Sequence, residues 1–139
     1  MTFALHPRLA ADTISLGRLN LCRVLLMNDA RWPWFILVPE REGVREIFEL
    51  EEEDQKLLHR ETMLLSRSVS DSFRADKMNI AALGNVVPQL HVHVIARYEN
   101  DATWPAPVWG KGEPVPYDAA GLERLRDFLL AVPGFKQAD

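Results

Sequence analysis

The longest regular pattern along the chain predicts one amphipathic helix. Between positions 50 and 73, apolar side chains recur every three or four residues, which places them on one face of an α-helix. Acidic residues fill positions 51–54 at its start, where the helix dipole favours negative charge. These carboxylates could also be taken for a metal site, but a solvated helix start is the simpler interpretation. The apolar stripe consists of Leu50, Leu57, Leu58, Met63, Leu64, Leu65, Val69 and Phe73.

Shorter apolar runs predict two β-hairpins. Residues 19–27 and 34–39 are rich in β-compatible side chains and flank the turn sequence NDARWP. The runs KMNIAALGNVV and QLHVHVIARY form the second pair, joined by a predicted tight turn around Gly84, Asn85 and Pro88.

Two further helices are expected near the ends of the sequence. The opening HPRLAADTISLG predicts a short helix that starts after Pro7 and ends near Gly17. A last helix is expected from about Asp118, a good N-cap, to Val132, where a Pro-Gly pair follows. The order helix, hairpin, helix, hairpin, helix predicts an α+β fold, an antiparallel β-sheet with a long central helix and a C-terminal helix.

Length and composition narrow the class of protein. A chain of 139 residues with 47% hydrophobic and 26% charged residues is typical of one globular domain, here spanning 1–139. The formal charge of −4 argues against a nucleic-acid polymer as partner, although a local phosphate pocket needs no overall basicity. Cys22 is the only cysteine, which favours a reducing cytoplasm over a disulfide or a cysteine-based metal cluster. Neither a signal peptide nor a membrane-spanning run is recognisable, so we expect a cytoplasmic protein without a membrane partner.

The stretch QLHVHVIAR, at positions 89–97, contains the strongest candidate for chemistry. In a strand, alternate residues share a face, so Gln89, His91 and His93 would project together while the apolar residues between them point into the core. Burying three such polar groups is costly unless each of them finds a partner. A binding or catalytic site would supply those partners.

Three uses of this row compete. The imidazoles could bind zinc or another divalent ion, with a third ligand from His6, His59 or a carboxylate. One imidazole could instead act as a nucleophile while its neighbours position the substrate. The remaining alternative is purely structural.

The same stretch resembles the signature of the histidine triad (HIT) superfamily, His-φ-His-φ-His-φ-φ, where φ is apolar. It is similar to the form found in the diadenosine polyphosphate hydrolase branch, in which an arginine ends the strand as Arg97 does. The similarity extends to LLMNDARWPWFILVPE, IFELEEEDQKLL and NIAALGNVVPQLHVHVIAR, and covers roughly residues 18–110. The resemblance implies a HIT-like α+β fold and a nucleotide hydrolase or nucleotidyl transferase.

The resemblance also implies roles for individual residues. His91 would attack the α-phosphorus of a dinucleoside polyphosphate or related nucleotide and form a covalent nucleotidyl-histidine, while His93 would hydrogen-bond phosphate oxygens. HIT proteins are usually homodimers without a tightly bound cofactor, so any Mg²⁺ is expected to arrive with the substrate phosphates. The remaining contacts would come from Asn28, for the ribose, and from Asn79, Gly84 and Asn85, for the phosphates.

Four positions depart from the HIT pattern. Asn85 stands where the pattern has a glutamine and keeps the amide on a shorter side chain. Gln89 stands where the first histidine belongs, and an amide cannot titrate near neutral pH. Val86 replaces a serine or threonine whose hydroxyl would assist a leaving group, and Ala96 replaces a common proline. These departures leave a catalytically impaired nucleotide-binding or regulatory module as the alternative function.

The tryptophans allow two interpretations. Trp104 and Trp109, in the Pro-rich segment after the histidines, could stack on a nucleobase, which is worth about 1–3 kcal/mol. They could equally pin that segment to the core. For Trp32 and Trp34, core packing is the favoured interpretation.

Arg97 likewise has two possible uses. At the end of the predicted strand it could contact a phosphate of the substrate, or it could pair with one of the carboxylates that follow, Glu99 or Asp101.

Overall fold

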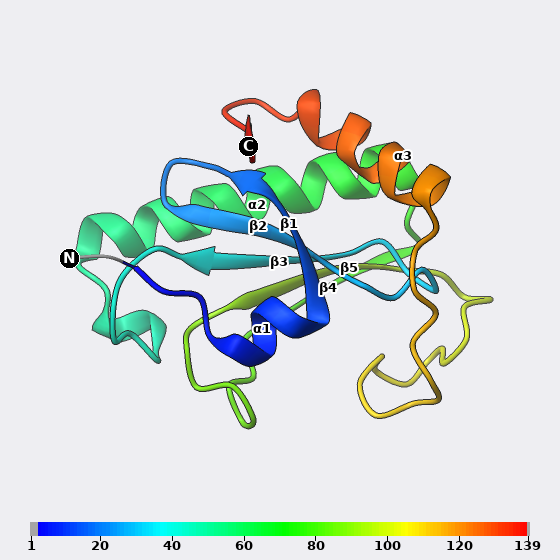
Figure 1. Cartoon of the computed structure of the whole chain (residues 1–139), viewed down its shortest axis with the longest axis horizontal. Coiled ribbons are helices and arrows are strands. Elements are labelled where there is room, and N and C mark those ends of the chain that lie inside the picture. Colours follow the sequence, from blue (N-terminus) through cyan, green and yellow to red (C-terminus); the bar gives the residue numbers. More distant parts are fainter. Residues whose placement is uncertain (1–2, 139) are drawn as a thin grey trace.

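A six-stranded antiparallel sheet forms the centre of the computed structural model, which describes residues 3–138 (Figure 1). The strands lie in the order β4-β5-β3-β2-β1-β6. No helix within residues 3–138 is both long and apolar enough to cross a bilayer. The strands are β1 (Thr13–Arg18), β2 (Cys22–Met27), β3 (Trp34–Pro39), β4 (Lys77–Ala81), β5 (Val92–Arg97) and β6 (Lys136–Gln137). The helices are α1 (Pro7–Asp12), α2 (Glu52–Phe73) and α3 (Ala119–Leu130), with a short 3-10 turn η1 (Ile47–Glu49).

Alternating side chains give the sheet two covered faces. One face packs against α2 and α3 through a core that includes Val24, Leu37 and Val94. The opposite face packs against Leu9 of α1 and Val108 of the segment that follows β5. Figure 1 shows α2 and α3 on one side of the sheet and α1 on the other. The candidate site lies on the α1 side.

The predicted α+β architecture is confirmed. α2 carries the predicted apolar stripe, in which Leu58, Leu65 and Val69 are buried. β2 and β3 pair as the predicted antiparallel hairpin. Asp118 caps α3 as expected, because its carboxylate accepts a hydrogen bond of 2.7 Å from the backbone N–H of Gly121.

The predicted N-terminal helix is too long. α1 ends at Asp12, and residues 13–18 form strand β1, which pairs with β2 and with β6. Thr13 already has an extended backbone, and its hydroxyl donates a hydrogen bond of 2.6 Å to the Leu9 carbonyl at the end of the helix. The helical interpretation failed because residues 13–18 pair with β2, the next strand in the sequence, and Gly17 and Arg18 also pair with β6, and these pairings override the local helical pattern.

The second predicted hairpin also needs correction. β4 and β5 are antiparallel neighbours, but residues 82–91 connect them as a longer loop instead of a tight turn. The backbone N–H of Leu90 donates to the Val44 carbonyl at 3.0 Å, so this part of the connection pairs with the loop before η1 and not with β4. His91 is therefore the last residue before β5, and Gln89 lies outside the strand.

Candidate active site

His91 and His93 lie side by side at the start of β5. Both side chains are buried, with 6% and 4% of their surface exposed. The centroids of their rings are 5.0 Å apart, and the ring planes cross at 67°. The structure thus brings together the two histidines that the sequence singles out, even though only His93 is part of the strand.

The imidazole of His91 has its proton on Nδ1. This atom lies 2.7 Å from the main-chain carbonyl oxygen of Gln89. A carbonyl oxygen only accepts hydrogen bonds, so Nδ1 must be the donor in the neutral ring. The other nitrogen, Nε2, then carries the lone pair that a nucleophile requires.

The imidazole of His93 has the opposite arrangement. The indole N–H of Trp34 donates to Nδ1 of His93 at 3.0 Å, and an indole nitrogen is a donor only. Nδ1 is therefore the acceptor, and in the neutral ring the proton lies on Nε2. Burial, with a smaller contribution from the neighbouring His91, lowers the pKa of His93 to about 3. His93 is therefore a neutral N–H donor at physiological pH.

The two histidines line a hollow of about 280 Å³, which we call the histidine hollow. Helix α1 supplies one side of it, including the charged pair Arg8 and Asp12, whose Nε and Oδ2 are 2.9 Å apart. The connection before β5 supplies Gly84 and Asn85, and Gly84 has a φ of 75°, in the left-handed region that favours glycine. The apolar lining consists of Leu9, Met27, Leu83, Val86, Val87 and Trp109.

A second hollow of about 480 Å³ adjoins the first and shares Arg8, Asp12, Met27 and Trp109 with it. Trp109 is the aromatic residue common to both hollows, and its ring centroid lies 5.0 Å from that of His93 at an interplanar angle of 81°. Of the two tryptophans proposed for base stacking, the structure places this one at the histidines.

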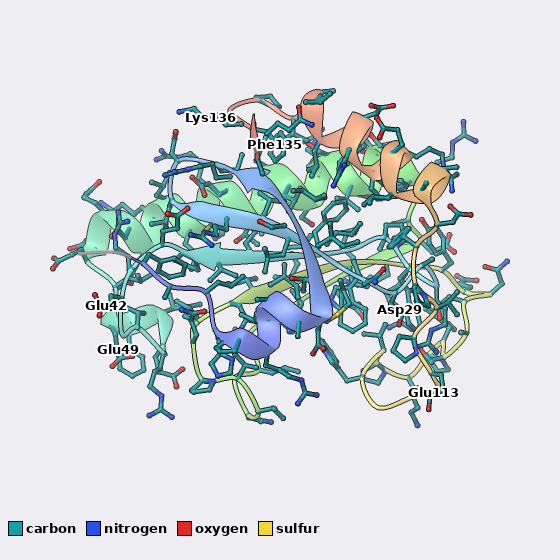
Figure 2. All side chains as sticks on the ribbon, viewed as in Figure 1. Asp29, Glu42, Glu49, Glu113, Phe135 and Lys136 are labelled. Carbon is teal, nitrogen blue, oxygen red and sulfur yellow. The ribbon has the colours of Figure 1, made fainter. Side chains whose placement is uncertain are left out.

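The rest of the second hollow includes four polar or charged residues, Asn28, Asp29, Arg31 and Lys111. Asn28 lines it, and its Oδ1 accepts a hydrogen bond of 2.9 Å from the backbone N–H of Tyr117. Arg31 and Asp29 form an ion pair of 2.8 Å there. Burial alone would raise the pKa of Asp29, but the hydrogen bonds from Arg31 and from the Val115 backbone N–H together outweigh it and hold that pKa below its ordinary value. Figure 2 shows Asp29 at the same end of the molecule as the loop that carries Glu113.

Arg97 lies at the other end of β5 and does not reach the histidine hollow. Its side chain is almost fully buried, and its Nε is 2.8 Å from Oδ2 of Asp101. Of the two uses considered for Arg97, the structure shows the pairing with Asp101. Asn79 belongs to the same network, since its Oδ1 accepts a hydrogen bond of 2.8 Å from Arg97 Nη1. Trp104 packs over the guanidinium, with 5.7 Å between Arg97 Cζ and the ring centroid.

Gln89 does not form a row with the two histidines. Its side-chain Oε1 accepts a hydrogen bond of 2.8 Å from the backbone N–H of His6, and its Nε2 donates one of 2.9 Å to the carbonyl of Ala4. Among the described residues that line the histidine hollow, Gln89 is absent. The predicted row fails because Gln89 lies in the connection and not in β5, so strand alternation does not govern its side chain.

Sequence reasoning missed the part of the site that comes from α1. Arg8, Leu9 and Asp12 are far from the histidines in sequence and follow no motif that would link them to the hollow. Only the packing of α1 on the sheet brings them there. Within residues 3–138, no group of three or more His, Cys, Asp or Glu side chains is arranged to hold a metal ion. The metal-site interpretation of the histidines therefore finds no ligand set in the described structure.

The chain belongs to the histidine triad family, because the model of the HIT domain matches residues 8–100. Membership of this family suggests nucleotide binding together with a hydrolase or transferase function. No curated protein matches the chain significantly.

Three solved structures are similar over nearly the whole chain. A histidine triad protein from Bradyrhizobium japonicum is 45% identical, with a TM-score of 0.93, covering 95% of this chain and 98% of its own. One from Marinobacter aquaeolei VT8 is 53% identical, with a TM-score of 0.92, covering 95% and 96%. One from Sinorhizobium meliloti 1021 is 47% identical, with a TM-score of 0.92, covering 94% and 97%. The architecture described above is therefore that of HIT proteins.

Proposed function

We propose that this protein is a hydrolase or nucleotidyl transferase of the diadenosine polyphosphate hydrolase type, with His91 as its nucleophile. It acts at the α-phosphorus of a dinucleoside polyphosphate or related nucleotide. The observation that carries the proposal is the opposite placement of protons on two adjacent imidazoles. The Gln89 carbonyl keeps the proton of His91 on Nδ1, whereas the Trp34 indole keeps the proton of His93 on Nε2. One ring thus offers a lone pair and the other an N–H beside the same hollow.

The reaction has two steps at phosphorus. In the first, Nε2 of His91 forms a bond to the α-phosphorus, and the electron pair of the broken P–O bond leaves with the remaining phosphates. The resulting N-phosphorylated imidazolium is positively charged, and the Gln89 carbonyl stabilises it by accepting from Nδ1–H. In the second, a water oxygen or another acceptor attacks phosphorus, the P–N bond breaks, and its electron pair returns to Nε2. When water attacks, it passes a proton to the solvent and a nucleoside monophosphate is released.

His93 and the connection before β5 stabilise negative charge in this scheme. The Nε2–H of His93 donates to a phosphate oxygen, and the low pKa of the ring keeps this nitrogen arrangement fixed across the physiological range. Gly84 and Asn85 line the same hollow and provide backbone N–H groups close to where the phosphate would lie. Neutral donors placed before the reaction need no rearrangement as the charge develops.

Two adjoining hollows favour a substrate whose reacting phosphate occupies one hollow while a sugar or further phosphates occupy the other. The histidine hollow takes the reacting phosphate, and the larger neighbour, lined by Asn28, Arg31 and Lys111, takes a sugar or further phosphates. Arg8 and Trp109 lie between the hollows and serve both, the first as a cation and the second as a surface for stacking on a base. Mg²⁺, where the reaction uses it, enters with the substrate phosphates. A cytoplasmic homodimer is the proposed working form.

Trapping the covalent intermediate tests the proposal. The protein is incubated with dinucleoside polyphosphates and nucleoside phosphoramidates, quenched under alkaline conditions, digested, and analysed by mass spectrometry. We expect the mass of one nucleoside monophosphate on the peptide that contains His91. His91→Ala should bind AMP but give neither adduct nor turnover, whereas His59→Ala, which changes an exposed imidazole on α2, should keep both. Turnover by His91→Ala at the normal rate would remove this residue from the mechanism.

A second candidate function, nucleotide binding without turnover, is favoured by Val86. Its side chain is 74% exposed at the histidine hollow, in the position where the HIT pattern provides a hydroxyl for the leaving group. The same experiment separates the two candidates. Bound AMP with neither adduct nor product from any of these substrates would favour the binding function.

A further inference from the structure

We infer that Gln89 is a positioning residue whose side chain anchors the N-terminal segment and thereby holds α1 as a wall of the histidine hollow. The pair of hydrogen bonds from the Gln89 amide to Ala4 and His6 is called the Gln89 anchor. The inference rests on the proposed function for its kinetic consequence, but the anchor itself can be tested without any substrate.

The Gln89 anchor has the geometry of a strand pairing. The amide accepts from the N–H of His6 at 2.8 Å and donates to the carbonyl of Ala4 at 2.9 Å, two main-chain groups on alternate residues. The amide thus satisfies one donor and one acceptor of an irregular segment that would otherwise depend on water for both. The two contacts join parts of the chain that are 83 and 85 residues apart. An imidazole could not replace this pair, because its two nitrogens point away from each other.

The anchored segment leads directly into the wall of the hollow. His6 is the N-cap of α1, and its Nδ1 accepts a hydrogen bond of 3.0 Å from the backbone N–H of Arg8. α1 has only six residues, of which Leu9 alone is buried. A helix of this length is not stable by itself, so its position depends on what holds its ends. Arg8 and Asp12, the charged residues of the histidine hollow, depend on the same support.

The main chain of Gln89 has a separate task. Its carbonyl accepts from Nδ1 of His91, and a change of the side chain leaves that carbonyl in place. Substitution of Gln89 should therefore move α1 while it keeps the proton of His91 on Nδ1. The expected effect falls on substrate binding more than on the chemical step.

Three variants separate the anchor from a direct chemical role. Gln89→Ala removes both hydrogen bonds. His6→Pro removes the backbone N–H that donates to Gln89, together with the imidazole cap, and the φ of His6, −54°, already fits proline. His6→Ala is the matched control, since it loses the same imidazole cap as His6→Pro but keeps the N–H. The readouts are KM and kcat with a dinucleoside polyphosphate, and hydrogen exchange of the backbone amides of residues 8–12 without substrate.

We expect Gln89→Ala to raise KM by about tenfold, the effect of losing one to two hydrogen bonds, while kcat falls by less than KM rises. Amide exchange in α1 should quicken. His6→Pro should reproduce both effects relative to His6→Ala, and adding it to Gln89→Ala should change little further, because the two substitutions break the same contact. Gln89→His, which restores the first histidine of the HIT pattern, should behave as Gln89→Ala does.

The outcomes distinguish the inference from the proposed function. Unchanged exchange in α1 of Gln89→Ala would overturn the anchor, even if adduct formation on His91 proceeds. A fall in kcat with KM and exchange unchanged would also overturn it, because the amide would then act on the reaction itself. If the wild-type protein forms no adduct, the proposed function fails, while quickened exchange would still establish the anchor.

Discussion

The two ends of β5 both carry buried polar side chains, but one end is closed and the other is open. At the C-terminal end, the guanidinium of Arg97 donates to Asp101, Asn79, Thr103 and the carbonyl of Ala106. At the N-terminal end, His91 and His93 are almost as deeply buried as Arg97. Yet each imidazole has one ring nitrogen held by the protein, and the other is left beside a hollow.

This difference separates a structural polar cluster from a chemical one. A buried polar group whose hydrogen bonds are all made within the protein rigidifies the fold and has nothing left to offer a ligand. A buried imidazole with one nitrogen fixed and one free is oriented, but its remaining bond is available. Both ends of β5 therefore carry buried polar groups. They differ in how many hydrogen-bonding atoms are already paired within the protein, and this difference points to a structural role for Arg97 and a chemical role for the histidines.

The largest expected effect is at the closed end. Arg97→Met keeps much of the side chain's length but leaves Asp101, whose side chain is 3% exposed, without its cation. Burial would raise the pKa of Asp101, and it is chiefly the Arg97 hydrogen bonds that hold it below its ordinary value instead. We expect a loss of about 3–5 kcal/mol in the free energy of unfolding, measured by urea denaturation.

A matched control is Arg67→Met on α2. Arg67 and Asp71 also form an ion pair, but their side chains are 86% and 75% exposed and their atoms are 3.9 Å apart. This variant should change stability by no more than about 0.5 kcal/mol. A loss of similar size in both variants would show that the Arg97 network is not special, and the contrast between the two ends of β5 would fail.

Local pattern was enough to predict most of the fold. The stripe of α2 and the hairpin β2–β3 are encoded in residues that are neighbours in sequence, so periodicity and turn residues reveal them. β1 and the loop at 82–91 could not be predicted in the same way. In β1, pairing with β2, the next strand, and with β6 overrides the helical pattern that the local sequence suggests. The loop at 82–91 is positioned by pairing with the loop at Val44, which is distant in sequence.

The candidate site also divides into a part that local sequence predicts and a part that distant contacts determine. The apolar alternation around His91 and His93 predicts correctly that the two rings meet on one face of the sheet. Gln89 lies two residues before His91, but it precedes the start of β5, and its side chain bonds the N-terminal segment instead of lining up with the histidines. The partner of Asn79 could not be predicted from sequence either, because its Oδ1 accepts from Arg97 at the other end of β5 from the histidines. Sequence pattern thus shows that neighbouring residues share a face, but it does not show which partners from distant parts of the chain a side chain will meet.

At the open end, acid should destabilise the fold through His93. The pKa of His93 is about 3 in the folded protein, below its ordinary value of 6.5. Between these two pH values the unfolded chain binds more protons than the folded chain, so stability rises with pH across this window and is constant above it. The slope from this group is at most about 1.4 kcal/mol per pH unit.

His93→Asn tests this contribution. The asparagine Oδ1 can still accept from the Trp34 indole N–H but cannot titrate. Subtracting the unfolding free energies of the variant from those of the wild type, between pH 3.5 and 8, cancels the carboxylates common to both. The difference should fall steadily as the pH drops below 6.5 and be flat above it. A flat difference over the whole range would mean that the pKa of His93 is the same in the folded and the unfolded chain, so that burial would not keep the ring neutral.

The smallest expected effect concerns the hydrogen bond that fixes the proton of His93. Trp34→Phe removes the indole N–H that Nδ1 accepts, so the proton can move between the two ring nitrogens and Nε2–H is no longer enforced. We expect kcat to fall by about tenfold or less, the effect of one hydrogen bond. Nitrogen NMR shifts of the imidazole should show a mixture of both neutral forms.

The neighbouring Trp32→Phe is the control for lost volume. Trp32 is also buried, its ring centroid is 6.1 Å from that of Trp34, and its Nε1 makes no hydrogen bond within the described residues. This variant should leave His93 with its proton on Nε2. If Trp34→Phe also kept that single form, a group other than the indole would be fixing the ring. The His93 ring would then be oriented by the walls of the hollow, and the position of its proton could not be explained by the hydrogen bond from Trp34.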